Sequence, residues 1–436
     1  MKKYSLTASQ KLLLYFQLLN RKKSAGNVCG SFTIQEKVDF EKLKKAVNFV
    51  IEKNDSMRIR ICFTPLGFKQ YFEDYREPDI EIIDVKTDDD VKEIENKINH
   101  EVFSMLKKSL LKIKFFRFED GTGGAVCCMH HIICDAWTVG LAINQIIAYY
   151  NGDEEKIISY PYYEHIKNER NYLLSEKMEK DKIFWEDLFK DNIPPPAVIP
   201  WDLKKTDKSR KSKFFQGHID KETIDSINEY CSKKNISICS FFTGIFSLYI
   251  GIDLNLNEFI LDTIISNRAN IKEKLTTGLF ARTLPFKAVI SEGTFENYIV
   301  NIHRDLSSFY RHYRYPTRKT LKIVKKKETG RKRTSKIWFS FQNAKTDKNL
   351  SKVPFKTRWT PIESTYLYDI LIELYDLEND GSLDITYNYL ESKYSASRIN
   401  QIHNAIVGMI DQVLNNNEIE IKDIKIAKSS RVLYQK

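Results

Sequence analysis

The chain has 436 residues, a formal net charge of +11 and a 42% share of hydrophobic residues. This length exceeds what one hydrophobic core usually organises, which favours two lobes, and this composition excludes a disordered protein. The sequence contains no run of about 18 uncharged apolar residues and no signal-peptide pattern, so we expect a cytoplasmic protein without a membrane segment.

Hydrophobic periodicity predicts strands and helices in alternation over the first part of the chain. The expected strands cover residues 28–35, 57–63, 68–74, 110–120 and 123–131. The expected helices cover residues 40–51, 88–107 and 137–150. Asp39 has the side chain and the position of an N-cap for the first of these helices.

A polar, helical region over residues 160–190 ends at DNIPPPAVIPWD, whose consecutive prolines cannot continue a helix. We therefore expect a connector here between an N-terminal lobe, residues 1–175, and a C-terminal lobe, residues 176–436. The second lobe has five further predicted strands, at 258–266, 283–290, 336–343, 369–377 and 382–389. The pattern indicates an α/β fold of two lobes, each with a largely buried sheet.

The positive charge is concentrated in one segment. From Arg311 to Lys336 there are twelve Lys or Arg residues against one acidic residue, Glu328. Such a run is compatible with a solvated surface loop or with a surface that binds an acidic partner. No nucleic-acid-binding pattern accompanies it, so an acidic protein is the better of the binding hypotheses, and we expect no nucleic-acid ligand.

The seven cysteines are an odd number and include no CxxC pair, which predicts reduced, mostly buried thiols and neither a disulfide framework nor a metal site. Cys134 lies between His131 and Asp135 and could be a nucleophile. Its apolar neighbours Ile132 and Ile133 favour a packed thiol instead.

The stretch AVCCMHHIICDAWTVG, from Ala125 to Gly140, places two histidines at the end of an apolar strand. Alternation along a strand sends the rings of His130 and His131 to opposite faces, so only one of them meets a substrate. Asp135, four residues after His131, could orient the loop before the next helix. Taken alone, the pair is also compatible with two hydrogen-bonded structural histidines.

HHIICDA resembles the HHxxxDG motif of the condensation domains of nonribosomal peptide synthetases, members of the chloramphenicol acetyltransferase-like superfamily. Further segments resemble that family's patterns in the same order. LTASQKLLLYFQ is similar to its opening SxAQxRLWFL pattern, and NDSMRIRICF to RHExLRTxF, with Arg58 at the second arginine. Later segments with such similarity are YYEHIKNERNYL, FWEDLF, IPWD, SNRANIKEKLTTGLFARTLPFK, FSFQN and LDITYNY.

The resemblance implies a V-shaped pseudodimer of two such lobes with a central tunnel. His131 matches the functionally central histidine, which takes a proton from the attacking amine or orients it; an imidazole with a pKa near 6.5 suits either role. His130 and Asp135 complete the catalytic motif, with Asp135 paired to Arg268, and Arg58 supports the site. The residues expected to line the tunnel are Ala136, Trp137, Asn267, Gln342 and Asn343.

The implied activity is amide formation between a carrier-bound acyl or aminoacyl thioester and an amine. The chain shows no adenylation domain and no GGxS carrier segment, so we expect a free-standing monomer that binds no cofactor or metal. Its substrates are expected on the phosphopantetheine of carrier proteins that bind in trans, with the basic segment as their docking site. Transfer to a hydroxyl or small free amine, and a catalytically silent recruitment module, stay open.

Two positions depart from the family's pattern. Ala136 replaces the motif glycine, which either strains a position that needs positive φ or narrows the tunnel. Ala281 and Arg282 replace a valine-asparagine-like pair before TLP, which puts the substrate side of the tunnel in doubt. An EGHGRE-like element is absent, which argues against an epimerase relative.

Overall fold

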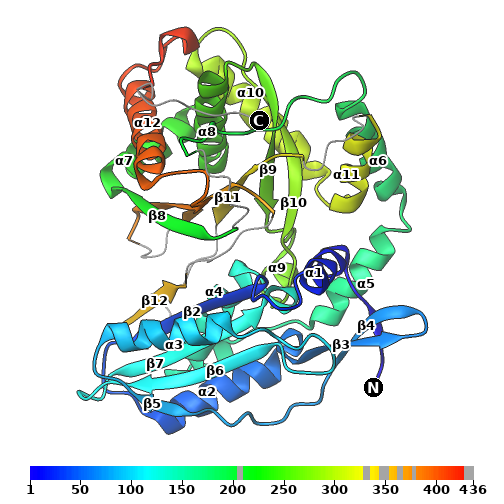
Figure 1. Cartoon of the computed structure of the whole chain (residues 1–436), viewed down its shortest axis with the longest axis vertical. Coiled ribbons are helices and arrows are strands. Elements are labelled where there is room, and N and C mark those ends of the chain that lie inside the picture. Colours follow the sequence, from blue (N-terminus) through cyan, green and yellow to red (C-terminus); the bar gives the residue numbers. More distant parts are fainter. Residues whose placement is uncertain (204–209, 328–333, 343–352, 361–366, 376–379, 427–436) are drawn as a thin grey trace. The chain divides into compact units, whose positions relative to one another are not determined.

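The computed structural model describes residues 1–203, 210–327, 334–342, 353–360, 367–375 and 380–426. The chain divides into two compact units, which Figure 1 shows in chain-order colours. Unit 1 comprises Met1–Ser175, Ser266–Ala281 and Asn343–Thr360, and unit 2 comprises Glu176–Ile265, Arg282–Gln342 and Pro361–Lys436. The predicted fold class, two α/β lobes, is confirmed.

The boundary at residue 175 agrees with the prediction, but two later segments join the first unit. Ser266–Ala281 brings Arg268 to Asp135. Asn343–Thr360 contains a strand that pairs with the edge of the unit 1 sheet. Both segments were expected in the C-terminal lobe. This expectation was wrong because local sequence patterns carry no information about such long-range pairing.

Unit 1 contains a five-stranded sheet of order β12-β2-β7-β6-β5 and a smaller one of order β1-β4-β3. Its strands are β1 (Tyr4–Ser5), β2 (Asn27–Ile34), β3 (Ile59–Thr64), β4 (Gly67–Phe72), β5 (Ile82–Asp84), β6 (Leu111–Arg117), β7 (Gly123–His130) and β12 (Phe355–Trp359). Its helices are α1 (Ala8–Leu19), α2 (Phe40–Lys53), η1 (Asp55–Arg58), α3 (Asp88–His100), η2 (His131–Ile133), α4 (Ala136–Tyr150), η3 (Glu154–Lys156), α5 (Tyr162–Tyr172) and α9 (Ile271–Lys274).

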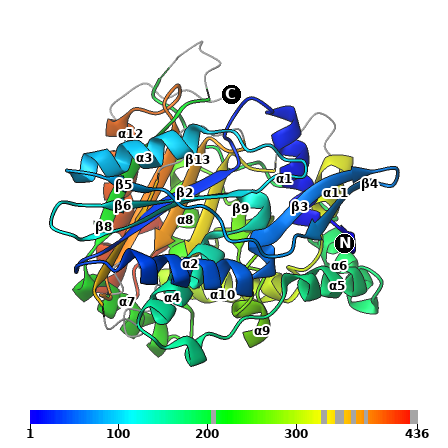
Figure 2. The ribbon, with the colours of Figure 1, turned by 90° about the horizontal axis from the view of Figure 1, so that it is seen from below.

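The five-stranded sheet is buried on both faces. Helices α2 and α4 pack on one face, where Leu43, Val47 and Ile147 meet Phe32 and Ala125. Helix α3, α1 and the turn η2 belong to the core of the other face. Figure 2 shows α3 on one side of the strands and α2 and α4 on the other. Because β7 is central in this sheet, the polar residues that follow it are held on a rigid base.

Unit 2 is built around a six-stranded sheet of order β10-β9-β11-β13-β14-β8. Its strands are β8 (Ser212–Ile219), β9 (Glu258–Ile265), β10 (Arg282–Val289), β11 (Ile337–Gln342), β13 (Ile370–Tyr375) and β14 (Leu383–Leu390). Its helices are α6 (Glu176–Leu188), α7 (Lys221–Lys233), α8 (Ile238–Leu254), α10 (Phe295–Arg311), α11 (Thr317–Lys327), α12 (Ala396–Asn415) and η5 (Ile421–Asp423).

Helix α8 is nearly all apolar because it lies at the centre of unit 2, in contact with α7, α10 and α12. Its residues from Ser240 to Gly251 are all buried. None of the described helices is alone both long and apolar enough to cross a membrane. Only α7 and α8 taken together meet those criteria within the described ranges, and they are bent by 103° at their junction.

Three local predictions are wrong. Helix α3 ends at His100 rather than near residue 107, because the Asn27 side chain donates hydrogen bonds to the Asn99 and Glu101 carbonyls at the helix end. The strand expected from residue 57 begins at Ile59, because Asp55–Arg58 forms the 3₁₀ turn η1. The basic segment forms the helix α11 over Thr317–Lys327 rather than a loop there.

Candidate active site

His131 lies just beyond the last residue of β7, in the short turn η2, and its ring is only partly buried. Nδ1 lies 2.7 Å from the carbonyl oxygen of Cys134. Since a carbonyl oxygen can only accept, Nδ1 carries the hydrogen, and the lone pair of the neutral ring is on Nε2. No hydrogen bond to Nε2 occurs among the residues that the structure describes, so this atom can accept one from a substrate.

His130 faces the interior, as alternation along β7 predicts. Its ring is 1% exposed, Nδ1 accepts from the Ile132 backbone at 3.1 Å, and Nε2 lies 3.3 Å from Gln17 Oε1. Burial, followed by the charge that His131 can carry, lowers the pKa of His130 to about 3. This ring is therefore neutral at pH 7 and shapes the turn, and in this position it cannot meet a substrate directly.

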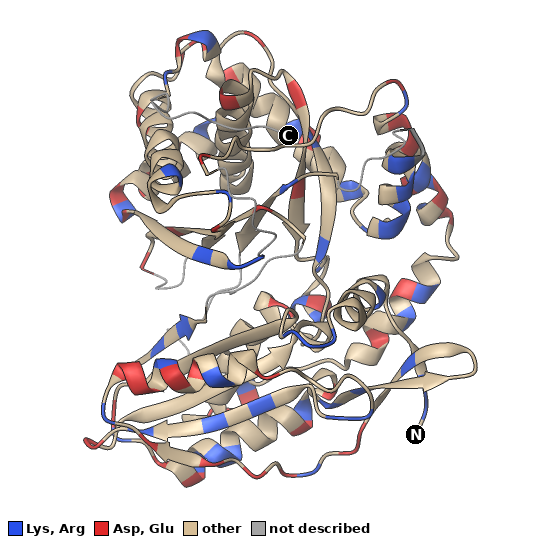
Figure 3. Ribbon diagram, in the orientation of Figure 1, with Lys and Arg blue, Asp and Glu red and all other residues tan. Residues whose placement is uncertain are grey.

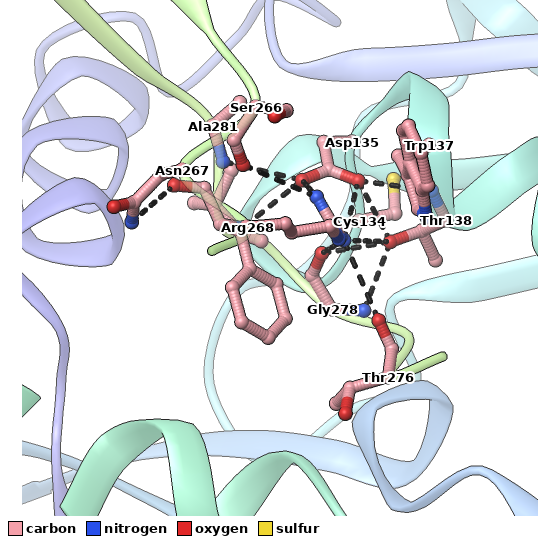
Figure 4. A network of polar contacts seen from close by, with 12 residues as sticks. Cys134, Asp135, Trp137, Thr138, Ser266, Asn267, Arg268, Thr276, Gly278 and Ala281 are labelled. Atoms are coloured by element: carbon pink, nitrogen blue, oxygen red, sulfur yellow. Dashed lines mark hydrogen bonds and ion pairs between the residues drawn. The ribbon is translucent and has the colours of Figure 1, made fainter. Parts of the chain in front are cut away.

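Asp135 is buried and paired with Arg268, as the resemblance implied. Arg268 Nη1 lies 2.8 Å from Oδ2, and Nη2 lies 3.1 Å from Oδ1 (Figure 4). Oδ2 also accepts from the backbone of Phe280 and Ala281, and Oδ1 from the backbone of Thr138. Burial raises the pKa of this carboxyl, but the charge of Arg268 and the hydrogen bonds outweigh burial and hold the pKa below its ordinary value.

This network fixes the turn that carries His131. Asp135 is the N-cap of α4, and the carbonyl that orients His131 belongs to the preceding residue, Cys134. An ionised Asp135 accepts hydrogen bonds only, which matches the donors around it. We therefore assign Asp135 and Arg268 to positioning, because neither is placed to exchange a proton with a substrate.

The segment of residues 276–281 forms hydrogen bonds with other parts of unit 1. Ser56 Oγ lies 2.6 Å from Thr277 Oγ1, and the Tyr162 hydroxyl donates to the Leu279 carbonyl at 2.7 Å. Gly278 has φ +131°, and a Cβ there would lie 2.2 Å from the ring of Tyr162. Glycine is thus required at this position both by backbone conformation and by space.

A buried amide pair supports η2 from α1. Gln10 and Gln70 exchange hydrogen bonds of 2.7 and 2.8 Å, and Gln10 Nε2 also donates to the Ile132 carbonyl at 3.2 Å. Thr7 and Gln10 form a capping box at the start of α1. Gln10 is not among the residues predicted for the site, although the Thr-x-x-Gln spacing of residues 7–10 is a sequence signal for this helix start.

All seven cysteines are free, as predicted. Cys134 is fully buried, and burial raises the pKa of its thiol well above the ordinary value. A protonated, enclosed thiol is a poor nucleophile. The structure therefore supports the packed-thiol interpretation of Cys134.

Other predicted site residues have structural contacts in unit 1. Arg58 donates to the backbone carbonyls of Ile51, Glu52 and Glu73 at 3.2, 3.0 and 2.6 Å, which ties the end of α2 to β4. Ala136 is the first residue of α4 and is not among the described positions with positive φ. The proposed backbone strain at this alanine is therefore absent.

The remaining expected tunnel residues fall in different places. The Trp137 indole donates to the Lys274 carbonyl at 2.8 Å, and Asn267, at φ 55°, donates to the Phe280 carbonyl at 3.0 Å. Gln342 lies in unit 2, where its amide donates to Ser340 Oγ. The expectation for Asn343 lies outside the described residues.

Thr138 and two backbone amides complete the site and were not identified from the sequence. The hydroxyl of Thr138 lies 2.8 Å from Asp135 Oδ1 and accepts from the Gly278 backbone at 2.9 Å. Its spacing three residues after Asp135 is typical of an N-cap partner. The amides of Phe280 and Ala281 left no sequence signal, because any residue except proline supplies them.

Comparison with known proteins gives one family over nearly the whole chain. A family model described as "Condensation domain" matches residues 1–431. The chain is 24% identical over 437 residues to surfactin synthase subunit 1 of Bacillus subtilis (strain 168), with 97% of the chain and 12% of the synthase covered. It is 20% identical to gramicidin S synthase 2 of Aneurinibacillus migulanus, with 97% of the chain and 10% of the synthase covered. The chain thus spans about a tenth of the length of these curated relatives.

Solved structures with the same fold include two condensation domains. The starter condensation domain of rhizomide synthetase, a mutant in complex with C8-CoA, has a TM-score of 0.84 at 14% identity, with 98% of each chain covered. The first condensation domain of the calcium-dependent antibiotic synthetase, in complex with a substrate analogue, has a TM-score of 0.82 at 12% identity, with 98% of this chain and 99% of that chain covered.

Proposed function

Because the chain belongs to the condensation-domain family, we propose that it forms an amide between an acyl thioester, delivered on a carrier protein's phosphopantetheine, and an amine. By their names, the relatives are a surfactin synthase subunit and a gramicidin S synthase, and one solved starter condensation domain, a mutant, is in complex with C8-CoA and Leu-SNAC. Those ligands belong to that protein. They support a thioester donor here.

The observation that carries the proposal is the tautomer of His131. Its Nδ1–H is held by the Cys134 carbonyl at 2.7 Å, and its Nε2 is left as an acceptor on a partly exposed ring. An amine must be neutral to attack and becomes acidic as it does so, and Nε2 can receive the hydrogen bond or the proton that this requires. His130 is neutral and enclosed, so His131 alone of the pair is assigned the catalytic role.

The proposed step balances as follows. The amine nitrogen attacks the thioester carbonyl carbon, the C–N bond forms, and the C–S bond breaks as the pantetheine thiolate leaves. The nitrogen gives one proton to His131 Nε2, and the resulting imidazolium gives one proton to the thiolate, directly or through water, which returns the ring to its neutral form. General-base assistance of this kind is typically worth about 10²–10⁴-fold, and the fixed turn between Cys134 and Asp135 contributes by orienting the ring beforehand.

The test is product identification by intact-mass spectrometry. A carrier protein loaded with an acyl thioester is mixed with the protein and either an amine or the matching alcohol. We expect amide product with the amine, and His131→Ala should form it about 10²–10⁴-fold more slowly, whereas Lys45→Ala, at an exposed lysine on α2, should form it at the wild-type rate. Ester formation alone would favour the hydroxyl acyltransferase, and absence of any product with every carrier tried would contradict the proposal in favour of a recruitment module.

A further inference from the structure

Helix α11 presents a basic face on unit 2. It packs against α6 and β10 and buries Thr320 and Val324 on its inner side. Its outer side exposes Arg318, Lys319, Lys322 and Lys325. Positions 318, 322 and 325 follow the i, i+4, i+7 spacing that puts side chains on one helix face. Figure 3 shows Lys and Arg following one another along this helix.

These four charges lack the partners that many lysines and arginines elsewhere on the surface have. In unit 1, a side-chain nitrogen lies 2.7 Å from a carboxylate oxygen in each of three such residues, Lys92, Lys114 and Arg117. Within the described ranges, no α11 side chain that the structure describes forms an ion pair. On the neighbouring helix α6, Glu179 is already paired with Lys182 at 3.5 Å. The basic face of α11 is therefore not neutralised by the described part of its own unit.

Helix stability does not explain this arrangement. The first turn of α11 contains no acidic residue and carries Arg318 and Lys319, where the helix dipole disfavours positive charge. Like charges at i, i+4, such as Arg318 and Lys322, also repel one another. Lys325, near the other end, is favoured by the dipole, so the dipole accounts for only one end of the face.

We propose that the outer face of α11 is a docking surface for an acidic protein whose carboxylates lie at helical spacing. Resting on the proposed function, this partner is the carrier that delivers the thioester. An acidic protein fits better than a single-stranded nucleic acid, because the four exposed side chains include no aromatic ring on which bases could stack, and duplex binding is left as an outcome of the test. Complementary charge at such a face raises the association rate and selects against other partners.

The experiment measures binding of an acidic peptidyl carrier protein, in its phosphopantetheinylated form, by calorimetry at low and high salt. Arg318→Glu/Lys322→Glu/Lys325→Glu should weaken binding at least ten-fold and flatten its salt dependence. The matched control, Lys45→Glu/Lys53→Glu/Lys97→Glu, changes the net charge equally at exposed positions of unit 1 and should leave the affinity within two-fold. Turnover of a soluble pantetheine thioester should be unchanged in both variants.

Several outcomes overturn the docking surface. The docking surface is refuted if the α11 variant binds the carrier with the affinity of the wild type, or if the control variant loses as much affinity as the α11 variant. It is also refuted if the wild type binds a DNA duplex but none of the carriers tested. The proposed function is judged separately, because turnover of the soluble thioester requires no docking. A variant that melts well below the wild type is replaced by Arg318→Gln/Lys322→Gln/Lys325→Gln, for which a loss of at least three-fold is expected.

Discussion

Replacement of Arg268 by methionine tests how the Asp135 network holds the turn of His131. The substitution removes the two hydrogen bonds to Asp135, at 2.8 and 3.1 Å, together with four longer ones of 3.3–3.4 Å to neighbouring oxygens, and leaves a carboxylate that is 3% exposed. Breaking a buried ion pair from one side typically costs about 3–5 kcal/mol. Asp135 keeps backbone donors from Thr138, Phe280 and Ala281, so we expect the lower end, about 3 kcal/mol of unfolding free energy.

Asp135→Asn should cost at least as much, because it leaves Arg268 without its carboxylate and turns an amide donor toward backbone N–H groups. The double variant removes both charges, so its cost should fall about 2 kcal/mol or more below the sum of the two single costs. Urea denaturation gives these free energies, and hydrogen exchange of residues 276–281 reports on the local site. Strictly additive costs, or unchanged exchange in Arg268→Met, would refute the reasoning.

The other predictions concern the turn and its supports. Folding lowers the pKa of His130 from 6.5 to about 3, so the folded state loses stability as pH falls below about 6.5. His130→Gln should reduce the loss of unfolding free energy between pH 8 and pH 5.5 by about 1.4 kcal/mol. If urea titrations show the same loss in the variant and the wild type, His130 is not buried in its neutral form. Gly278→Ala should lower the unfolding free energy by about 2 kcal/mol more than Gly152→Ala, because Gly152 also has positive φ but has open space around it. Equal losses in the two variants would show that the Tyr162 ring moves aside to make room for the new Cβ. Ala136→Gly should change the unfolding free energy by less than about 1 kcal/mol, since position 136 is an ordinary helical one, and a loss above 2 kcal/mol in the same titration would be inconsistent with that.

Sequence patterns predicted the strands and the facing of the histidines because these depend on local alternation. β7 ends at His130, and the two rings separate into a buried and a partly exposed one, as a period of two requires. The partner of Asp135 was reached only through the resemblance, because Arg268 is 133 residues away and nothing in its own neighbourhood distinguishes it from a surface arginine.

What sequence reasoning missed depends on contacts between distant segments. The tautomer of His131 follows from the position of the Cys134 carbonyl, and the early end of α3 follows from the Asn27 side chain. β12 joins unit 1 by pairing with β2, where Gly30 leaves room for the Arg358 carbonyl; a Cβ at Gly30 would lie 2.6 Å from that oxygen. No local periodicity encodes such contacts, so only the folded chain reveals them.

The most direct measurement is the single-turnover rate of amide formation by wild type and His131→Ala, with a saturating amine and a carrier-bound acyl thioester, followed by intact mass. If Nε2 of His131 assists the attacking amine, the rate falls by about 10²–10⁴-fold while the variant keeps the melting temperature of the wild type. A rate within two-fold of the wild type, in a folded variant, would contradict the assignment of the chemistry to this imidazole.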